Sequence, residues 1–257
     1  MLLLCSVIVS VCGAPVARAA ESPPVRLLVP AYFYPSGAGK TAWDKLLDSA
    51  ARTPIVAIVN PDSGPGKRAD DNYREIFRRA AQTPLQLIGY VTLSYAQRPV
   101  SAVKADIDSW LYFYPEVQGI FFDEQPSSAE QAAFAIECFA YARQRLGSGR
   151  IVTNPGVPCA RTYLAGTDAP TACLFEHETG FDEFRMPDWA ASLSPDRFAV
   201  LLYNVANPAD MKRLVAVATQ RRFGFLFITD RQRPNPWDGL PIYWDDLVSQ
   251  AAAARLK

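Results

Sequence analysis

The sequence predicts an α/β protein with the architecture of a single (β/α)8 barrel, the TIM-type barrel. Short, nearly continuous apolar runs alternate with amphipathic helical patterns, as parallel strands joined by crossover helices require. Eight such runs are present, and polar residues follow each of them. A doubly wound open sheet is the alternative, although it normally carries a phosphate-binding turn after its first strand. No linker or shift in composition divides the chain, so we expect one domain over residues 21–257.

Each expected strand is apolar over most of its length, which is the pattern of a strand buried on both faces. The helical patterns between the strands recur with the spacing of a face turned toward a core. The expected strands are residues 26–35, 54–61, 85–93, 117–124, 149–155, 172–178, 198–205 and 223–230. The clear helical patterns are residues 42–52, 72–81, 101–114, 128–146, 209–222 and 244–256, and the weaker ones are 161–164 and 182–191.

The composition is that of a globular protein with a large core. Of the 257 residues, 49% are hydrophobic and 20% are charged, and 26 Lys and Arg balance 26 Asp and Glu. These values exclude a disordered or collagen-like chain. The absence of a basic excess argues against a nucleic-acid partner. We expect a monomer.

The first twenty residues have the pattern of a cleavable signal peptide. An apolar run over residues 2–11 is followed by Ala17-Arg18-Ala19, the small-x-small pattern of a cleavage site. The run is too short to span a bilayer as a helix. We therefore expect a secreted or periplasmic protein without stable membrane insertion.

Removal of residues 1–20 leaves three cysteines. They are Cys138, Cys159 and Cys173. An odd number allows one disulfide and one free thiol. Cys159 and Cys173 flank one short segment, so this pair is the economical expectation, whereas Cys138 falls in a helical pattern and is expected to be buried. No spacing matches a zinc site, and we expect no metal or other cofactor.

The residues 36–41 imitate a phosphate-binding loop between a strand and a helix. The full pattern requires glycine five positions before Gly39, where Tyr34 stands, so we reject nucleotide binding. We expect a first loop in which Thr41 caps the following helix. His177 is the only histidine, which argues strongly against a Ser-His-Asp triad.

Polar and aromatic residues gather where the expected strands end. In a closed barrel these ends meet at one mouth, where barrel enzymes place their chemistry. Sugar rings stack on aromatic faces, and amides, hydroxyls and carboxylates bind sugar hydroxyls. The candidate substrate-binding residues are Tyr32, Tyr34, Asn60, Tyr90, Thr92, Asn154, Tyr203, Asn204 and Asp230.

Three carboxylates are the candidate catalytic residues. Asp123 and Glu124 follow an apolar strand directly, and Glu176 ends an apolar run two strands later. Desolvation at such positions raises the pKa of a carboxyl group and favours a general acid. A pair of carboxyl groups across a mouth is the minimal apparatus of glycoside hydrolysis. Adjacent strand residues point to opposite sides, but the sequence alone leaves open whether Asp123 or Glu124 acts directly.

Several longer motifs resemble the spherulin-4 family, and the resemblance extends from about residue 27 to residue 230. They lie at the strand ends and in the loops and helices that follow them. The motifs are Leu28-Val29-Pro30 with Tyr32 and Tyr34-Pro35, Asn60-Pro61-Asp62-Ser63-Gly64-Pro65-Gly66 with Asp70 and Tyr73, Gly89-Tyr90-Val91-Thr92 with Tyr95 and Arg98, Asp106-Ile107 with Trp110 and Tyr112, Gly119-Ile120-Phe121-Phe122-Asp123-Glu124, Asn154-Pro155-Gly156 and Phe175-Glu176.

The resemblance implies a (β/α)8 glycoside hydrolase of family 135. Such proteins act on α-1,4-linked exopolysaccharide that contains N-acetylgalactosamine, as in biofilms, and Asp123, Glu124 and Glu176 match their essential acids. The sequence departs from the family pattern at His177-Glu178-Thr179, where a small residue is expected after the acid, so the exact sugar stays open. The alternative is a non-catalytic carbohydrate-binding or coat protein on the same barrel. A non-catalytic binding protein does not need all three acids, so the presence of all three favours the enzyme.

Overall fold

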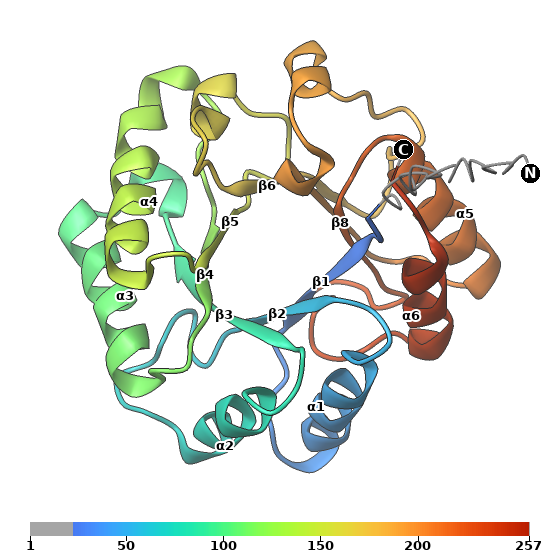
Figure 1. Ribbon diagram of the computed structural model, residues 1–257, viewed down its shortest axis with the longest axis horizontal. Helices are drawn as coiled ribbons and strands as arrows, with labels where there is room; N and C mark the ends of the chain where they lie inside the picture. The colour runs from blue at the N-terminus through green and yellow to red at the C-terminus, as the bar shows by residue number, and fades with distance from the viewer. Residues whose placement is uncertain (1–22, 257) are drawn as a thin grey trace, which may run out of the picture.

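The computed structural model describes residues 23–256 and contains one closed barrel of eight parallel strands (Figure 1). Each strand pairs with the next along the chain, and β1 also pairs with β8, which closes the barrel. The predicted fold is therefore confirmed, while the expected signal peptide lies outside the described residues. The strands are β1 (Arg26–Ala31), β2 (Ile55–Val59), β3 (Gln86–Thr92), β4 (Gly119–Asp123), β5 (Arg150–Thr153), β6 (Thr171–His177), β7 (Phe198–Leu202) and β8 (Phe225–Ile228).

The strands form because their side chains are buried both inside the barrel and under the helices. Every residue of β2, β7 and β8 is buried, as the continuous apolar runs indicate. Each strand ends one to four residues before the end of its expected run, because the polar residues that follow leave the sheet. Those residues are therefore released into the loops at the C-terminal end of the barrel, which we call the mouth.

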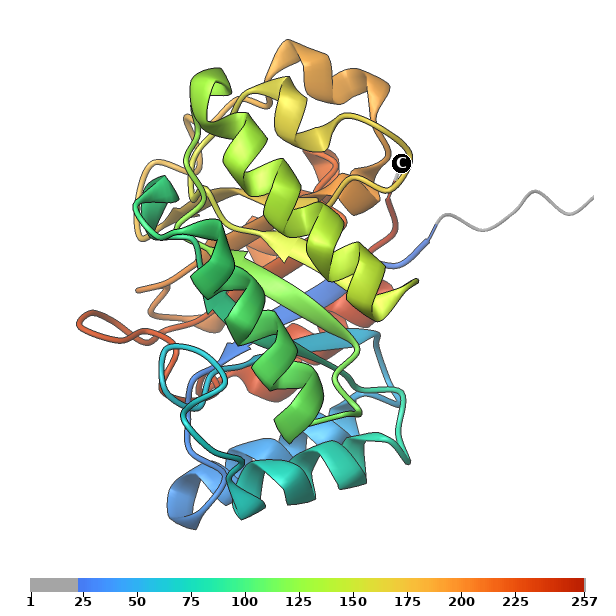
Figure 2. The ribbon, with the colours of Figure 1, turned by 90° about the vertical axis from the view of Figure 1, so that its left-hand side faces the viewer.

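In the part of the chain that the structure describes, six α-helices cover the outside of the barrel, and Figure 2 shows two of them, α3 and α4, side by side. Among the described residues, no helix is long and apolar enough to cross a membrane. The helices are α1 (Gly37–Ser49), α2 (Asp71–Ala80), α3 (Val100–Phe113), α4 (Ala132–Leu146), α5 (Pro208–Gln220) and α6 (Trp244–Ala253).

Short 3-10 turns replace α-helices after β5 and β6, where the helical patterns are weakest. The expected helix over residues 161–164 is the turn η3 (Arg161–Leu164). The expected helix over residues 182–191 is wrong, because only the turn η4 (Asp188–Ser192) forms there. Pro187 immediately precedes this turn, and a proline inside a helix would remove a backbone donor and clash with the preceding turn.

The first helix begins earlier than expected. Ser36 stands at its N-cap position and the helix starts at Gly37, so the predicted cap at Thr41 is wrong and Thr41 lies inside the helix. Gly37 adopts a φ of 54°, which glycine accepts without strain. A Cβ atom on Gly39 would lie 1.9 Å from the carbonyl oxygen of Tyr34, so this turn packs tightly on the loop that follows β1.

The expected disulfide between Cys159 and Cys173 is wrong, because both thiols are free in the structure. Cys173 lies in β6 inside the barrel wall and is completely buried, whereas Cys159 belongs to the loop after β5. The thiol of Cys173 instead lies 3.4 Å from the carbonyl oxygen of Phe175. Cys138 is free and buried in α4, where it packs as a small apolar side chain.

Candidate active site

The mouth of the barrel contains a cavity of about 470 Å³ with two carboxylates in its wall. Asp123 is the last residue of β4, and Glu176 lies next to the end of β6. Both side chains are only partly exposed. The cavity is lined by Tyr32, Asn60, Asp123, Glu176, Tyr203, Arg233, Pro234, Asn235, Pro236 and Trp237.

One amide group connects the two acids. The Nδ2 atom of Asn154 donates to Asp123 Oδ1 at 2.9 Å and to Glu176 Oε2 at 2.5 Å. Asn154 follows β5, which lies between β4 and β6, so the carboxylates of two alternate strands meet over the strand between them. The hydroxyl of Tyr90, from β3, donates to the other oxygen of Asp123 at 2.8 Å. The two acids therefore have neutral partners that fix their positions.

The surroundings of the two acids raise their pKa values. Burial raises the pKa of Asp123, and the hydrogen bonds from Tyr90 and Asn154 oppose this shift. Burial, together with the charge of Asp123, raises the pKa of Glu176 to about 7. Hydrogen bonds from Asn154 and Trp237 and the charge of Arg233 act in the opposite direction. Glu176 is therefore able to exchange a proton near neutral pH, as a general acid must.

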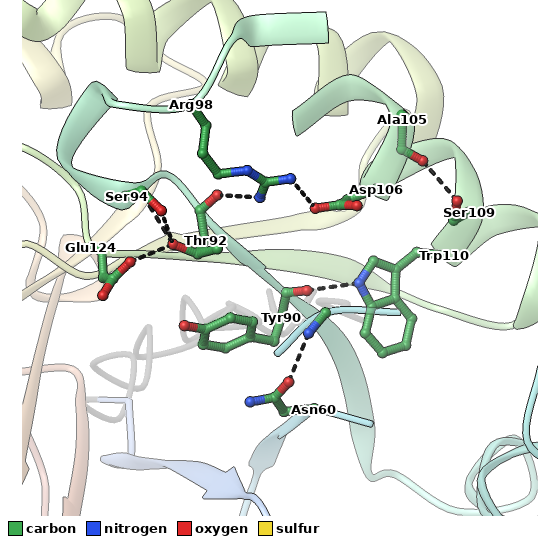
Figure 3. A network of polar contacts seen from close by, with 11 residues as sticks. Asn60, Tyr90, Thr92, Ser94, Arg98, Ala105, Asp106, Ser109, Trp110 and Glu124 are labelled. Atoms are coloured by element: carbon green, nitrogen blue, oxygen red, sulfur yellow. Dashed lines mark hydrogen bonds and ion pairs between the residues drawn. The ribbon is translucent and has the colours of Figure 1, made fainter. Parts of the chain in front are cut away.

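Glu124 occupies separate surroundings. Its backbone has a φ of 53°, which ends the strand and turns the side chain toward β3. The hydroxyl of Thr92 donates to Glu124 Oε2 at 2.5 Å. Figure 3 shows this bond together with the contacts of Thr92 to Ser94 and Arg98. Arg98 in turn pairs with Asp106 at 2.7 Å, so a chain of contacts from α3 fixes the orientation of Glu124.

A register shift in β6 determines where Glu176 points. Between Cys173 and Phe175 the pairing with β7 passes over Leu174, so one extra residue interrupts the alternation of faces. Burial raises the pKa of the partly exposed Tyr32 inside the barrel, and the neighbouring Glu176 and Cys173 raise it further. Phe175 points the other way and packs against Phe181, at a centroid distance of 5.1 Å.

Six of the predicted substrate-binding residues lie at the cavity or hold its acids. Tyr32, Asn60 and Tyr203 line the cavity. The side chains of Tyr90 and Asn154 contact Asp123. Thr92 contacts Glu124, as described above.

The other three predicted residues do not line the cavity and make local contacts. Tyr34 is half exposed, and its hydroxyl donates to Asp70 at 2.9 Å. Asn204 donates to Glu178 at 2.9 Å. Asp230 accepts a hydrogen bond from the backbone N–H of Ile242 at 3.1 Å, which orders the loop between β8 and α6.

The loop between β8 and α6 supplies half of the residues that line the cavity, and none of these was among the substrate-binding residues predicted from the sequence. Figure 2 shows it projecting from one end of the barrel. Arg233 donates to the hydroxyl of Tyr203 at 3.0 and 3.2 Å, and Trp237 is almost completely buried beside it. The signal was the Arg233-Pro234-Asn235-Pro236-Trp237 stretch after the eighth strand, where prolines restrict the backbone around a tryptophan.

Comparisons with known proteins agree with this architecture. The model of a family described as spherulation-specific family 4 matches residues 26–251. Spherulin-4 of Physarum polycephalum is 35% identical over 149 residues, which are 57% of this chain and 44% of that protein. The chain thus spans less than half the length of this curated relative.

Solved structures with the same fold include several carbohydrate-active proteins. The crystal structure of Aspergillus clavatus Sph3 in complex with GalNAc is 28% identical, with a TM-score of 0.74, and the match covers 90% of this chain and 98% of Sph3. Active domain 2 of a thermostable chitinase from Pyrococcus furiosus is 11% identical, with a TM-score of 0.57 and coverage of 91% and 97%. The second likeness concerns the fold alone.

Proposed function

The chain belongs to spherulation-specific family 4, and from this membership and the geometry of the mouth we propose that it is a secreted glycoside hydrolase. Its proposed substrate is an exopolysaccharide with α-1,4-linked N-acetylgalactosamine or galactosamine, which it would cleave at internal bonds of the polymer. Three features support this substrate: the resemblance to the spherulin-4 family, the likeness to a structure that contains GalNAc, and an open cavity beside the acids.

The observation that carries the proposal is the bridge from Asn154 to both acids. The two oxygens that contact this nitrogen are separated by no more than the sum of 2.9 and 2.5 Å. This upper limit lies below the ~6.5 Å at which the carboxyl separation of inverting glycosidases begins, and it allows the ~5–5.5 Å of retaining enzymes. We therefore favour a retaining mechanism.

Glu176 is the proposed general acid and Asp123 the proposed nucleophile. Glu176 has a pKa of about 7 and so carries a proton near neutral pH, whereas Asp123, whose pKa burial also raises, receives two hydrogen bonds that favour its ionised form. In the first step an Asp123 oxygen bonds to the anomeric carbon while the glycosidic bond breaks, and the leaving oxygen takes the Glu176 proton. In the second step a water gives its proton to Glu176, attacks the anomeric carbon and releases Asp123. Glu124 is proposed to position the sugar beside this pair.

A digest of purified α-1,4-linked galactosaminoglycan with the mature protein tests the proposal. Mass spectrometry of the products should show oligosaccharides of several lengths, as expected from cuts within the chain. The matched control is the Glu176→Gln variant, in which the shape of the side chain is kept. Binding of the polymer without release of oligosaccharides would contradict the hydrolase and favour the non-catalytic carbohydrate-binding protein.

Export and oligomeric state form a separate part of the proposal. The mature chain should begin near Ala20 or Glu21, after removal of the expected signal peptide. Intact-mass measurement on secreted material determines the first residue, and sedimentation determines whether the protein is a monomer. Retention of Met1 in the secreted material would contradict the cleavage.

A further inference from the structure

A second cavity, of about 690 Å³, lies at the opposite end of the barrel from the carboxylates. Its wall includes the first residues of β3, β5 and β6 and the turn η5 (Pro195–Arg197) before β7. We call this end the floor. Three arginines line the cavity, Arg143, Arg150 and Arg197, and Asp196 is the single carboxylate among its lining residues.

Arg150 lines this cavity, and two neighbours hold its guanidinium group. Its Nε atom donates to Gln86 Oε1 at 3.2 Å, and its guanidinium carbon lies 5.0 Å from the ring centroid of Phe225. Arg26 lies over the same buried ring at 4.8 Å and pairs with Asp196 at 2.6 Å. Within residues 23–256, the terminal nitrogens of Arg150 donate no hydrogen bond and contact no carboxylate.

The carboxylates near the floor, Asp196 and Asp168 beside Arg143, are fewer than its arginines. Asp196 is already engaged by Arg26. Arg143 donates to the backbone carbonyl of Gly149 at 2.5 Å, and Arg197 donates to the carbonyl of Ala169. Carbonyl groups satisfy these donors but leave the charges in place. Burial and the neighbouring charges of Arg26 and Arg143 lower the pKa of Arg150, and the charge of Asp196 acts in the opposite direction.

We propose that the floor cavity binds a tetrahedral oxyanion, phosphate or sulfate, either as a free ion or as a substituent of a polysaccharide. The planar guanidinium group presents parallel donors that match two oxygens of such an anion. The hydroxyls of Ser148 and Ser194 line the same cavity and are able to donate to the remaining oxygens. A bound oxyanion would supply the negative charge that the floor lacks.

The test is isothermal titration of the full mature protein with sodium phosphate, sodium sulfate and sulfated dextran, at constant ionic strength set with chloride. The wild-type protein should give saturable binding, and Arg150→Gln should raise the Kd about tenfold or more because it removes the charge-assisted donors. Saturation by the inorganic ions identifies a free anion, whereas saturation by sulfated dextran alone identifies a substituted polysaccharide. Binding that does not saturate with any of the three ligands would overturn the proposal.

A second variant keeps the test decisive if Arg150→Gln fails to fold. Ser194→Asp places a carboxylate at the cavity wall, and aspartate is as good an N-cap as the serine that caps η5. It should abolish anion binding through repulsion. Arg213→Gln, on the exposed face of α5, is the matched control and should bind as the wild type does. Unchanged binding in Ser194→Asp would show that the anion does not occupy this cavity.

Discussion

The mouth of the barrel brings two carboxyl groups together and the floor brings several arginines together, but the two ends stabilise these like charges with different partners. At the mouth, Asp123 and Glu176 share one amide donor and no arginine forms an ion pair with them among the described residues. At the floor, arginines stack on Phe225 and donate to backbone carbonyls. Burial raises the pKa of a carboxyl group into the neutral range, whereas an arginine keeps its charge at any such pH. Burial of like charges therefore gives a carboxyl group that is able to exchange a proton at the mouth and a fixed positive charge at the floor.

Removing either acid of the pair should have the largest effect on activity. We expect Asp123→Asn and Glu176→Gln each to lower turnover by about 10²–10⁴-fold or more, because the first variant removes the nucleophile and the second removes the group that gives and takes the proton. Both replacements keep the shape of the side chain, so the melting temperature and the affinity for the polysaccharide should change little. Release of reducing ends from the polymer measures the loss. Activity near the wild-type rate in either variant would show that the pair is wrongly assigned.

Glu124→Gln should cause a smaller loss, of about 10²-fold, because misplacement of a bound sugar by about 1 Å is enough for such an effect. Thr92→Val removes the 2.5 Å hydrogen bond that orients Glu124, and it should lower activity in the same direction. Thr92→Ser keeps the hydroxyl and should restore most of the activity. Separate determination of kcat and KM distinguishes positioning from a general loss of folding, which circular dichroism would detect.

The change of kcat/KM with pH should be smaller than the losses caused by these substitutions, and it reports on the proton of Glu176. Since the pKa of this group is about 7 and the acid form is required, kcat/KM should fall as the pH rises through about 7. Arg233 lowers the pKa of Glu176, so Arg233→Gln should move this limb of the profile to higher pH. Lys212→Gln, on the exposed surface of α5, is the matched charge control. A shift to lower pH in Arg233→Gln would contradict the assignment of Glu176.

The smallest expected effect separates the two ends of the barrel. Arg150→Gln should leave kcat/KM on the polysaccharide unchanged within about twofold, because distant sites without shared partners contribute independently. Its position at the first residue of β5 places it at the other end of that strand from Asn154. A large loss of activity in a folded Arg150→Gln protein, measured in the same reducing-end assay, would show that the floor and the mouth are coupled.

The sequence predicted those parts of the molecule that follow from burial. Strands such as Ile55–Val59 are apolar throughout, so their position and parallel packing could be recognised without a structure. The candidate acids were found for the same reason, since Asp123 and Glu176 interrupt apolar runs at the strand ends. By contrast, the bridge through Asn154 depends on strand neighbours across the barrel, and no local pattern encodes such a contact.

Other features depended on competition between tertiary contacts and local patterns. The segment 182–191 has helical periodicity, but Pro187 and packing of Phe181 and Phe184 on the barrel prevent a long helix. Proximity in sequence suggested a bond between Cys159 and Cys173, whereas β6 keeps Cys173 inside the wall. Trp237 was not among the predicted substrate-binding residues, because the shape of its loop is not a periodic feature.

The extra residue in β6 makes the direction of Glu176 depend on how the strand is paired. Substitutions alter one side chain at a time, but if Leu174 paired as a regular strand residue, every following residue of the strand would move by one face. Phe175 would then enter the mouth, and Glu176 would turn toward the helices, although no acid had been mutated. Deletion of Leu174 would instead keep the facing pair, because Phe175 and Glu176 already follow Cys173 in register opposite Val200 and Leu201. Within the family, the bulge between Cys173 and Glu176 is therefore as informative about the chemistry as the identity of the acid.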